Sequence, residues 1–222
     1  MNLPEPHRRL LTDVLAAAAP LSLAGGYALQ AHGLLERPHA NVDFATESAE
    51  PMPHLAAALR DALISRGREV TLRDADPLSA HLSVTDPESG TASLLGLHKE
   101  TLWSPPVLTP YGPTLCLEDA VGTKIRALYD RGLPVDLIDA RAASSRFTHQ
   151  DLEELGRRHA RDDFDLPTLQ TRLEGTDTYA DAAFTTYGLT NEETTALRAW
   201  AQTWSTDIAE RLLEEGTSPA ED

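Results

Sequence analysis

The sequence predicts an α+β protein, in which a small mixed β-sheet is flanked by helices and followed by a helical C-terminal half. Three observations predict this fold class. Strand-like and helix-like segments alternate over residues 5–67. Three strand-like segments then follow at 68–75, 80–86 and 91–98, with turn signals near them. From residue 117 onward, apolar residues recur almost throughout at helical spacing.

The first half of the chain carries clear stop signals for its helices. Pro20 ends the first helical pattern, and Gly67 ends another that Pro51 and Pro53 introduce. The expected elements are a helix at 5–19, a strand at 21–24, a helix at 27–33, a strand at 40–46 and a helix at 54–67. The three strand-like segments that follow are expected to form a meander. The proline-rich segment 104–114 is expected to be a loop or an edge strand.

The second half reads as a series of helices. One covers 117–131, and the next starts at Pro134, a residue suited to a first helical turn. Thr148 and Asp151 form the capping-box pattern of a third helix, and Thr190 caps the last long one. That helix has an apolar stripe typical of a core or packing seam: Leu197, Trp200, Ala201, Trp204, Ile208 and Leu212. We therefore expect a core at 1–113, a helical region packed on it at 114–216 and a disordered tail at 217–222.

Composition limits the function classes. The 222 residues carry 19 Lys plus Arg against 35 Asp plus Glu, a net charge of −16. Such a balance argues against non-specific coating of nucleic acid, which rests on neutralising phosphates, and no DNA partner is expected. Arg157, Arg158 and Arg161 are interpreted as a solvated helix face. Cys116 is the only cysteine and is expected to be a small buried hydrophobe.

The N-terminal apolar stretch does not predict membrane insertion. Asp13 interrupts it, and its alanine-rich part is too short and too weakly apolar for a spanning helix. It reads as an amphipathic helix rather than a signal peptide. A cytoplasmic protein without a membrane partner is expected.

The segment 23–44 carries the main indication of chemistry. The Gly25-Gly26 pair lets backbone N–H groups approach a ligand at the start of a helix, where anions are favoured. Asn41 and Asp43 are two residues apart on the next strand, so both side chains project from one face. Oxygen ligands placed in this way suit a divalent cation that also binds substrate phosphates. This order indicates a nucleotide–metal site, although the glycine pair alone would also fit a plain turn.

Two blocks of the sequence resemble a known family. They are "LAGGYALQAHGLLERPHANVDF", within 21–44, and "LCLEDAVGTKIRALYDRGLPVDLIDARAA", at 115–143. Both are similar to the nucleotidyltransferase superfamily of the DNA polymerase β type, and within it to the AbiEii/AbiGii toxin group. The resemblance implies a nucleotidyltransferase-type core that transfers a nucleoside monophosphate from an NTP to an acceptor. The acceptor would be a tRNA, a protein or a small molecule, and the protein would be the toxin of a toxin–antitoxin pair with a cognate antitoxin.

The resemblance also implies residue roles. Asp43, Lys124 and Asp136 would be catalytic, with Asp136 orienting Lys124 or the acceptor. Asp43 and Asn41 would bind Mg²⁺ or Mn²⁺, weakly at most. The NTP would be bound by Gly25, Gly26, Tyr27, Arg37, Lys124 and Arg131. Asp139 is expected to be structural.

The chain departs from the family pattern at three places. Asn41 stands at the first metal carboxylate, and His39 stands where the family has serine or threonine. No acid occupies the strand expected to carry the third carboxylate, where Ser93, Leu95 and Leu97 are expected to face the Asn41–Asp43 pair. His32, His39 and His98 show no metal-ligand spacing. Two readings stay open: an active transferase with an altered site, or a degenerate fold that binds nucleotide, RNA or protein without turnover.

Overall fold

The protein is described by a computed structural model that covers residues 3–17, 19–37 and 39–217. It divides into two compact units, Met1–Ala120 and Val121–Asp222, called unit 1 and unit 2 below. Of the tail expected to be disordered, residues 218–222 lie outside the described residues.

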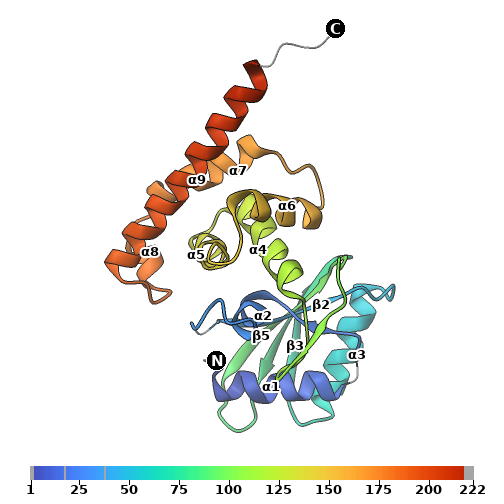
Figure 1. Cartoon of the computed structure of the whole chain (residues 1–222). Coiled ribbons are helices and arrows are strands. Elements are labelled where there is room, and N and C mark those ends of the chain that lie inside the picture. Colours follow the sequence, from blue (N-terminus) through green and yellow to red (C-terminus); the bar gives the residue numbers. More distant parts are fainter. Residues whose placement is uncertain (1–2, 18, 38, 218–222) are drawn as a thin grey trace. The chain divides into compact units, whose positions relative to one another are not determined.

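The described part of unit 1 contains a mixed sheet, part of which is labelled in Figure 1. Its strand order is β3-β4-β5-β2-β1-β7-β6. The strands are β1 (Ser22–Leu23), β2 (Asn41–Thr46), β3 (Glu69–Ala75), β4 (Ser79–Thr85), β5 (Ala92–Lys99), β6 (Val107–Thr109) and β7 (Gly112–Thr114). β2 pairs with β5 and β1 with β7 in parallel, whereas the other neighbours are antiparallel. The expected α+β class and the β3-β4-β5 meander are both confirmed.

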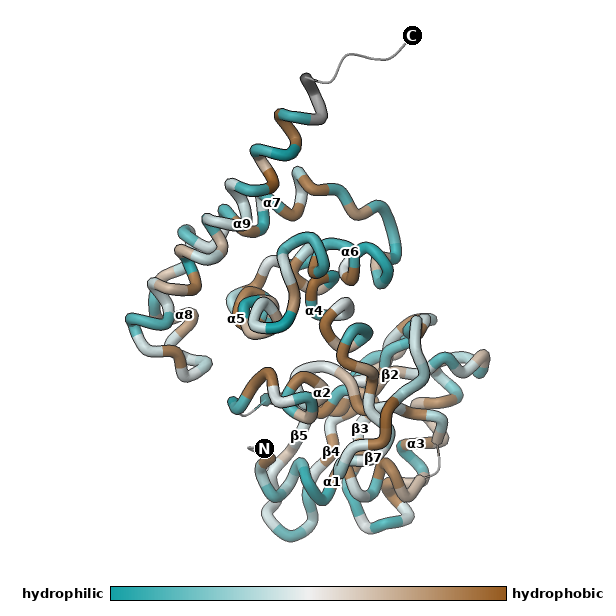
Figure 2. Tube along the Cα trace, in the orientation of Figure 1, coloured by the Kyte–Doolittle hydropathy of each residue, from teal (hydrophilic) through white to brown (hydrophobic). Residues whose placement is uncertain are grey.

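Three helices accompany this sheet: α1 (Glu5–Ala16), α2 (Gly25–Ala31) and α3 (Met52–Ile64). α1 and α3 bury apolar side chains in one core with the sheet, and Figure 2 shows apolar residues (brown) along the strands. Members of this core include Leu10, Leu11, Val14, Val42, Phe44, Met52, Ala56, Leu59, Leu63, Leu82, Leu95 and Leu97. Removal of this apolar surface from water is the main stabilising term for such a sheet.

Alternation along β2 separates a core face from a polar face. Val42 and Phe44 are 1% and 0% exposed and belong to the core, whereas Asn41 and Asp43 are only partly buried. Successive side chains of a strand point to opposite faces, so Asn41 and Asp43 lie on the face turned away from that core. The sequence prediction of this alternation is confirmed.

Unit 2 is helical in its described part. It contains most of α4 (Leu117–Arg131), then α5 (Pro134–Ala143), α6 (His149–His159), α7 (Leu166–Glu174), η1 (Gly175–Thr178), α8 (Ala182–Thr185) and α9 (Asn191–Thr217). The predicted capping box at Thr148 and Asp151 is present, and Thr190 caps α9 through Glu193. α9 packs against α7 and α5.

The apolar stripe of α9 is a packing seam, as predicted. Leu197, Ala201, Trp204 and Ile208 are at most 2% exposed, and the Trp204 indole donates a hydrogen bond to Glu153 at 2.8 Å. Cys116 is likewise buried, and burial raises the pKa of its thiol to about 11. Within the described residues, no helix combines the length and apolar character needed to span a bilayer.

Candidate functional site

The carboxylate of Asp43 lies between two glycines. A Cβ atom added to Gly25 would stand 2.5 Å from Asp43 Oδ2, and one added to Gly96 would overlap Asp43 Oδ1. Gly25 also has φ +61°, a conformation that L side chains rarely adopt. Both positions therefore require glycine while Asp43 keeps this place.

Strand pairing produces this arrangement from distant parts of the chain. β1 and β2 pair with Leu23 opposite Phe44, and the Ala24 N–H donates to the Asp43 carbonyl at 2.8 Å. The chain then turns at Gly25 directly beside the Asp43 side chain. On the other side, the parallel pairing of β2 with β5 sets Gly96 directly opposite Asp43.

Asn41 contacts Asp43 through its amide. Asn41 Nδ2 donates to Asp43 Oδ1 and Oδ2 at 3.2 and 3.3 Å. A neutral hydrogen-bond donor thus occupies the position of the expected first metal carboxylate. It adds no negative charge beside Asp43.

Gly26 is explained by a different neighbour. The space that its Cβ would take is filled by the imidazole ring of His39, which also packs edge-on against Tyr27 with ring centroids 4.7 Å apart. Tyr27 itself is 1% exposed, and its hydroxyl lies 2.6 Å from His7 Nδ1. Burial raises the pKa of Tyr27 to about 12, while the charge of Arg37 acts in the opposite direction. The structure thus places Tyr27 in the packing beneath the glycine turn.

His98 is a site residue that the sequence did not reveal. Its Nε2 lies 3.6 Å from Asp43 Oδ1, and its side chain is 30% exposed. The expectation that Ser93, Leu95 and Leu97 face the Asn41–Asp43 pair is wrong, because these three are at most 4% exposed. The parallel register instead pairs Asn41, Asp43 and Ala45 with Leu94, Gly96 and His98. Only the pairing register, not the spacing within the sequence, could have identified them.

Further polar side chains continue along the same sheet face. The ring of His81, on β4, is edge-on to that of His98 with centroids 5.8 Å apart. His81 Nδ1 in turn lies 2.7 Å from Asp74 Oδ1 on β3. No group of three His, Cys, Asp or Glu side chains within the described ranges is placed to hold a metal ion by itself.

In unit 2, two predicted residues have partners other than those expected. Lys124 Nζ forms an ion pair at 2.9 Å with Asp139, whose side chain is 0% exposed. Asp136 instead pairs with Arg131 at 2.5 Å and accepts from the Leu133 N–H at the start of α5. The carboxylate that orients Lys124 is thus that of Asp139, and Asp136 holds Arg131 and the first turn of α5.

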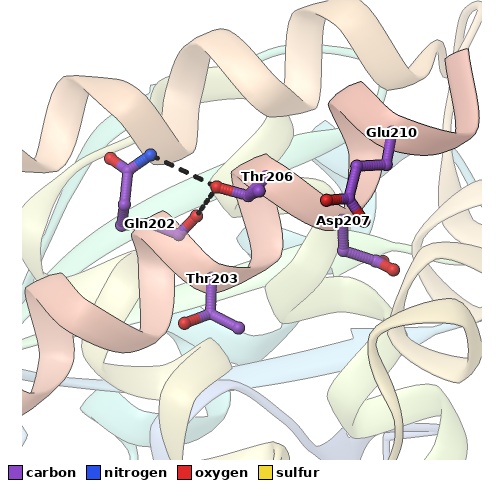
Figure 3. A pocket seen from close by; sticks show the side chains of 5 residues that line it. All are labelled: Gln202, Thr203, Thr206, Asp207 and Glu210. Atoms are coloured by element: carbon purple, nitrogen blue, oxygen red, sulfur yellow. Dashed lines mark hydrogen bonds between the residues drawn. The ribbon is translucent and has the colours of Figure 1, made fainter. Parts of the chain in front are cut away.

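A hollow of about 330 Å³ lies along α9 (Figure 3). Its lining is amide, hydroxyl and carboxylate: Gln202, Thr203, Thr206, Asp207 and Glu210. The Gln202 amide and the Thr206 hydroxyl are 3.5 Å apart, a weak contact. A hollow with two carboxylates and no basic side chain in its lining is unsuited to phosphate, so it is not the candidate site.

Solved structures of similar fold place the chain among known proteins. JHP933 from Helicobacter pylori is 17% identical with a TM-score of 0.54, over 96% of this chain and 98% of that one. Another H. pylori structure, provisionally assigned as a nucleotidyltransferase, is 16% identical with a TM-score of 0.58, over 94% and 98%. MenT4, a nucleotidyltransferase toxin from Mycobacterium tuberculosis H37Rv, is 15% identical with a TM-score of 0.57, over 91% and 85%.

No family model matches the sequence, and no curated protein matches it significantly. The structural likeness extends over most of the chain, and it establishes a nucleotidyltransferase-type fold. This confirms the fold that the sequence resemblance implied.

Proposed function

We propose that the protein transfers a nucleoside monophosphate from an NTP to an acceptor hydroxyl. The observation that carries the proposal is the Asp43 carboxylate held between Gly25 and Gly96 on the polar face of a nucleotidyltransferase-type sheet. A carboxylate at a place that two glycines keep open can be approached by a phosphorylated ligand and its cation.

The proposed transfer requires only the NTP and the acceptor as reactants. The acceptor oxygen forms a bond to the α-phosphorus, the bond from that phosphorus to the β-phosphate oxygen breaks, and pyrophosphate leaves. The acceptor proton passes to solvent. Catalysis of this kind rests mainly on positioning and on stabilising charge.

A divalent cation fits the site only in part. Asp43 supplies one carboxylate. The side-chain amide of Asn41 points its N–H group, not its carbonyl oxygen, toward that carboxylate. Mg²⁺ or Mn²⁺ would bind together with the triphosphate and would offset the charge of the phosphates. Asp43 would be the carboxylate that the protein supplies to this cation. Gly25 and Gly26 are proposed to face the phosphates with their backbone, and Tyr27 and Arg37 to support that turn.

The residues proposed in unit 2 rest on the family resemblance. Lys124 would offset phosphate charge, and its ion pair with buried Asp139 would fix the direction of its ammonium. Arg131 would contact substrate, and the bond from Asp136 would restrict its guanidinium. Asp136 would act on the substrate through Arg131.

The acceptor class and the biological role are also proposals. The likeness to MenT4, a nucleotidyltransferase toxin, supports a toxin role, which implies a cognate antitoxin. The family resemblance of the sequence suggests tRNA as one acceptor. A protein or small-molecule acceptor would use the same transfer step.

The alternative function is a nucleotide-, RNA- or protein-binding module that has lost turnover. One observation favours it: a neutral amide, Asn41, is bonded to Asp43 in place of a second acid. A site with one carboxylate holds less charge for cations than a site with two.

Label transfer tests the main proposal. The purified protein is incubated with each α-³²P-labelled NTP, Mg²⁺ or Mn²⁺, and bulk tRNA or cell lysate. We expect labelled acceptor with the natural protein and none with Asp43→Asn, a variant of nearly equal volume. Absence of transfer with every NTP and both cations would contradict the enzyme proposal.

Calorimetric titration with the same NTPs separates the two functions. NTP binding that requires Asp43 but is never followed by transfer would establish the binding module. Gly175→Ala lies outside the site, and a Cβ there would meet nothing within 4 Å, so it serves as a folding control.

A further inference from the structure

We infer that His98 is a ligand of the cation at Asp43, and that this site therefore prefers a divalent transition cation such as Mn²⁺ over Mg²⁺. The inference rests on the proposed function and adds to it the identity of the second protein ligand and the class of metal.

The distance between the two side chains supports shared coordination. His98 Nε2 and Asp43 Oδ1 are 3.6 Å apart, which is longer than an ordinary hydrogen bond. Metal–ligand bonds of about 2.0–2.2 Å place two neighbouring ligands of one ion roughly 3.0–3.5 Å apart. The observed separation is thus close to that of two ligands of a single cation.

The space between the two atoms is kept open by Gly96. A Cβ at this position would overlap Asp43 Oδ1 and would lie 2.9 Å from His98 Nε2. The strand therefore carries glycine at the one position of β5 where any other side chain would enter the gap between carboxylate and imidazole. Hydrogen bonding within the sheet does not require glycine there, since β5 continues through it in regular register.

The neighbouring strand orients the imidazole. His81 packs edge-on against His98, and the His81 Nδ1 is itself held at 2.7 Å from Asp74. His81 has almost the same exposure as His98, 33% against 30%. It lies on the same sheet face, across Gly96 from Asp43, but its Nδ1 is held by Asp74, so it is a matched control for the ligand role.

The donor chemistry then decides the class of cation. Asn41 adds no charge, so the protein offers one carboxylate and one imidazole nitrogen. Mg²⁺ demands oxygen ligands, whereas imidazole suits transition cations. Because no third acidic, histidine or cysteine ligand is grouped with them in the described residues, the remaining ligands are triphosphate oxygens and water. Cation and NTP are therefore expected to bind together.

Pulsed electron paramagnetic resonance of bound Mn²⁺ tests the ligand directly. The full chain is produced with ¹⁵N-histidine and loaded with Mn²⁺ and the α,β-methylene analogue of each NTP. The label separates a histidine nitrogen from a nitrogen of the nucleobase. We expect ¹⁵N coupling in the natural protein and in His81→Ala, and its loss in His98→Ala and His98→Gln. Absence of ¹⁵N coupling in the natural protein, or coupling that persists in both His98 variants, would overturn the inference.

Cation titrations in the presence of the same analogue give a second readout. His98→Ala should weaken Mn²⁺ binding by about tenfold or more, the range typical of a lost contact at a metal site, and should change Mg²⁺ binding much less. Equal losses for both cations would overturn the inference. Circular dichroism establishes that the variants are folded.

These experiments distinguish a failure of the His98 assignment from a failure of the proposed transferase function. Label transfer that is driven by Mg²⁺ and is unchanged in His98→Ala would overturn the metal assignment and leave the transferase standing. Mn²⁺ coordination by His98 without any label transfer would support the ligand and contradict the transferase.

Discussion

The Asp43 carboxylate is the residue around which the other site residues are arranged. Gly25 and Gly96 border its two oxygens, Asn41 donates to both of them, and His98 lies beside one. The two glycines are required by sterics, because a Cβ atom at either position would clash with Asp43. Asn41, in contrast, affects the charge of the site, because it is neutral where the family has a carboxylate. Changes at these positions therefore separate shape from charge.

Gly96→Ala tests the shape of the site. The new Cβ would overlap Asp43 Oδ1, so we expect label transfer to fall about tenfold or more, and the free energy of unfolding to fall by about 1–3 kcal/mol from overpacking. Gly175→Ala is the matched control, because a Cβ there meets nothing within 4 Å. Transfer assays and urea denaturation measure both effects. Equal behaviour of the two variants would refute the steric argument.

Asn41→Asp tests the charge of the site. Two adjacent carboxylates repel each other, so the melting temperature should fall in the absence of divalent cations. Added Mg²⁺ should then raise it by more than it raises that of the natural protein, because a second carboxylate strengthens cation binding. Thermal unfolding with and without Mg²⁺ measures this, and an identical response of both proteins would contradict it. A gain of label transfer would mark the natural site as impaired, whereas a loss would mark Asn41 as adapted to its own chemistry.

Buried ion pairs fix particular elements within each unit. In unit 1, Arg9 of α1 bonds through two nitrogens to Asp86, which follows β4 and is 1% exposed. Arg68, ahead of β3, approaches the same carboxylate at 3.5 Å. In unit 2, Lys124 and Asp139 join α4 to α5.

Asp86→Asn should lower stability in a pH-dependent way. The hydrogen bond from Arg9 holds the pKa of Asp86 well below its usual range. A carboxyl whose folded-state pKa is depressed contributes stability above its unfolded pKa of about 4, and that contribution is lost as the pH falls further. The difference in unfolding free energy between natural and variant proteins should thus be largest near neutral pH and shrink below about pH 4.

Denaturant titrations across that range measure the difference. Asp61→Asn is the control, since its side chain is 64% exposed beside Arg60. A difference for Asp86→Asn that stays constant with pH would contradict the prediction.

Asp139→Asn should destabilise unit 2 strongly. It leaves the Lys124 ammonium, only 16% exposed, without its carboxylate partner, and breaking such a pair costs about 3–5 kcal/mol. Asp130→Asn, on the same α4 but 54% exposed, should change stability by less than about 0.5 kcal/mol. Urea denaturation of both variants decides the point, and similar losses would show that burial of the pair is unimportant.

At the scale of the whole molecule, the net charge of −16 disfavours non-specific binding to polyanions such as RNA. Strong non-specific RNA binding requires many phosphate contacts, which an acidic protein supplies poorly. A fluorescent RNA of random sequence should therefore show no saturable binding at physiological ionic strength. Fluorescence anisotropy measures this, and tight binding that weakens steeply with added salt would reveal an extended basic surface.

Much of the fold was predictable because its signals are local. The helix over 117–131 has the predicted bounds, α5 starts at Pro134, and the Thr148 cap is present. The net charge and the alternation of Asn41 to Phe44 are also properties of short stretches or of composition. Of the residues gathered at the candidate site, the sequence indicated Gly25, Gly26, Asn41 and Asp43, which lie close together in the chain; their role there stays a prediction.

The sequence by itself therefore determined the α+β class, most of the helices, the acidic character and the glycine turn ahead of Asp43. The tertiary structure decided which distant residues join them. A one-residue shift in strand register exchanges the two faces of a strand, so only the β2–β5 pairing shows that Gly96 and His98, not Leu95 and Leu97, lie beside Asp43. Likewise, only the packing of α4 against α5 shows that Lys124 forms its ion pair with Asp139. Asp136 instead accepts a hydrogen bond from the Leu133 N–H at the start of α5.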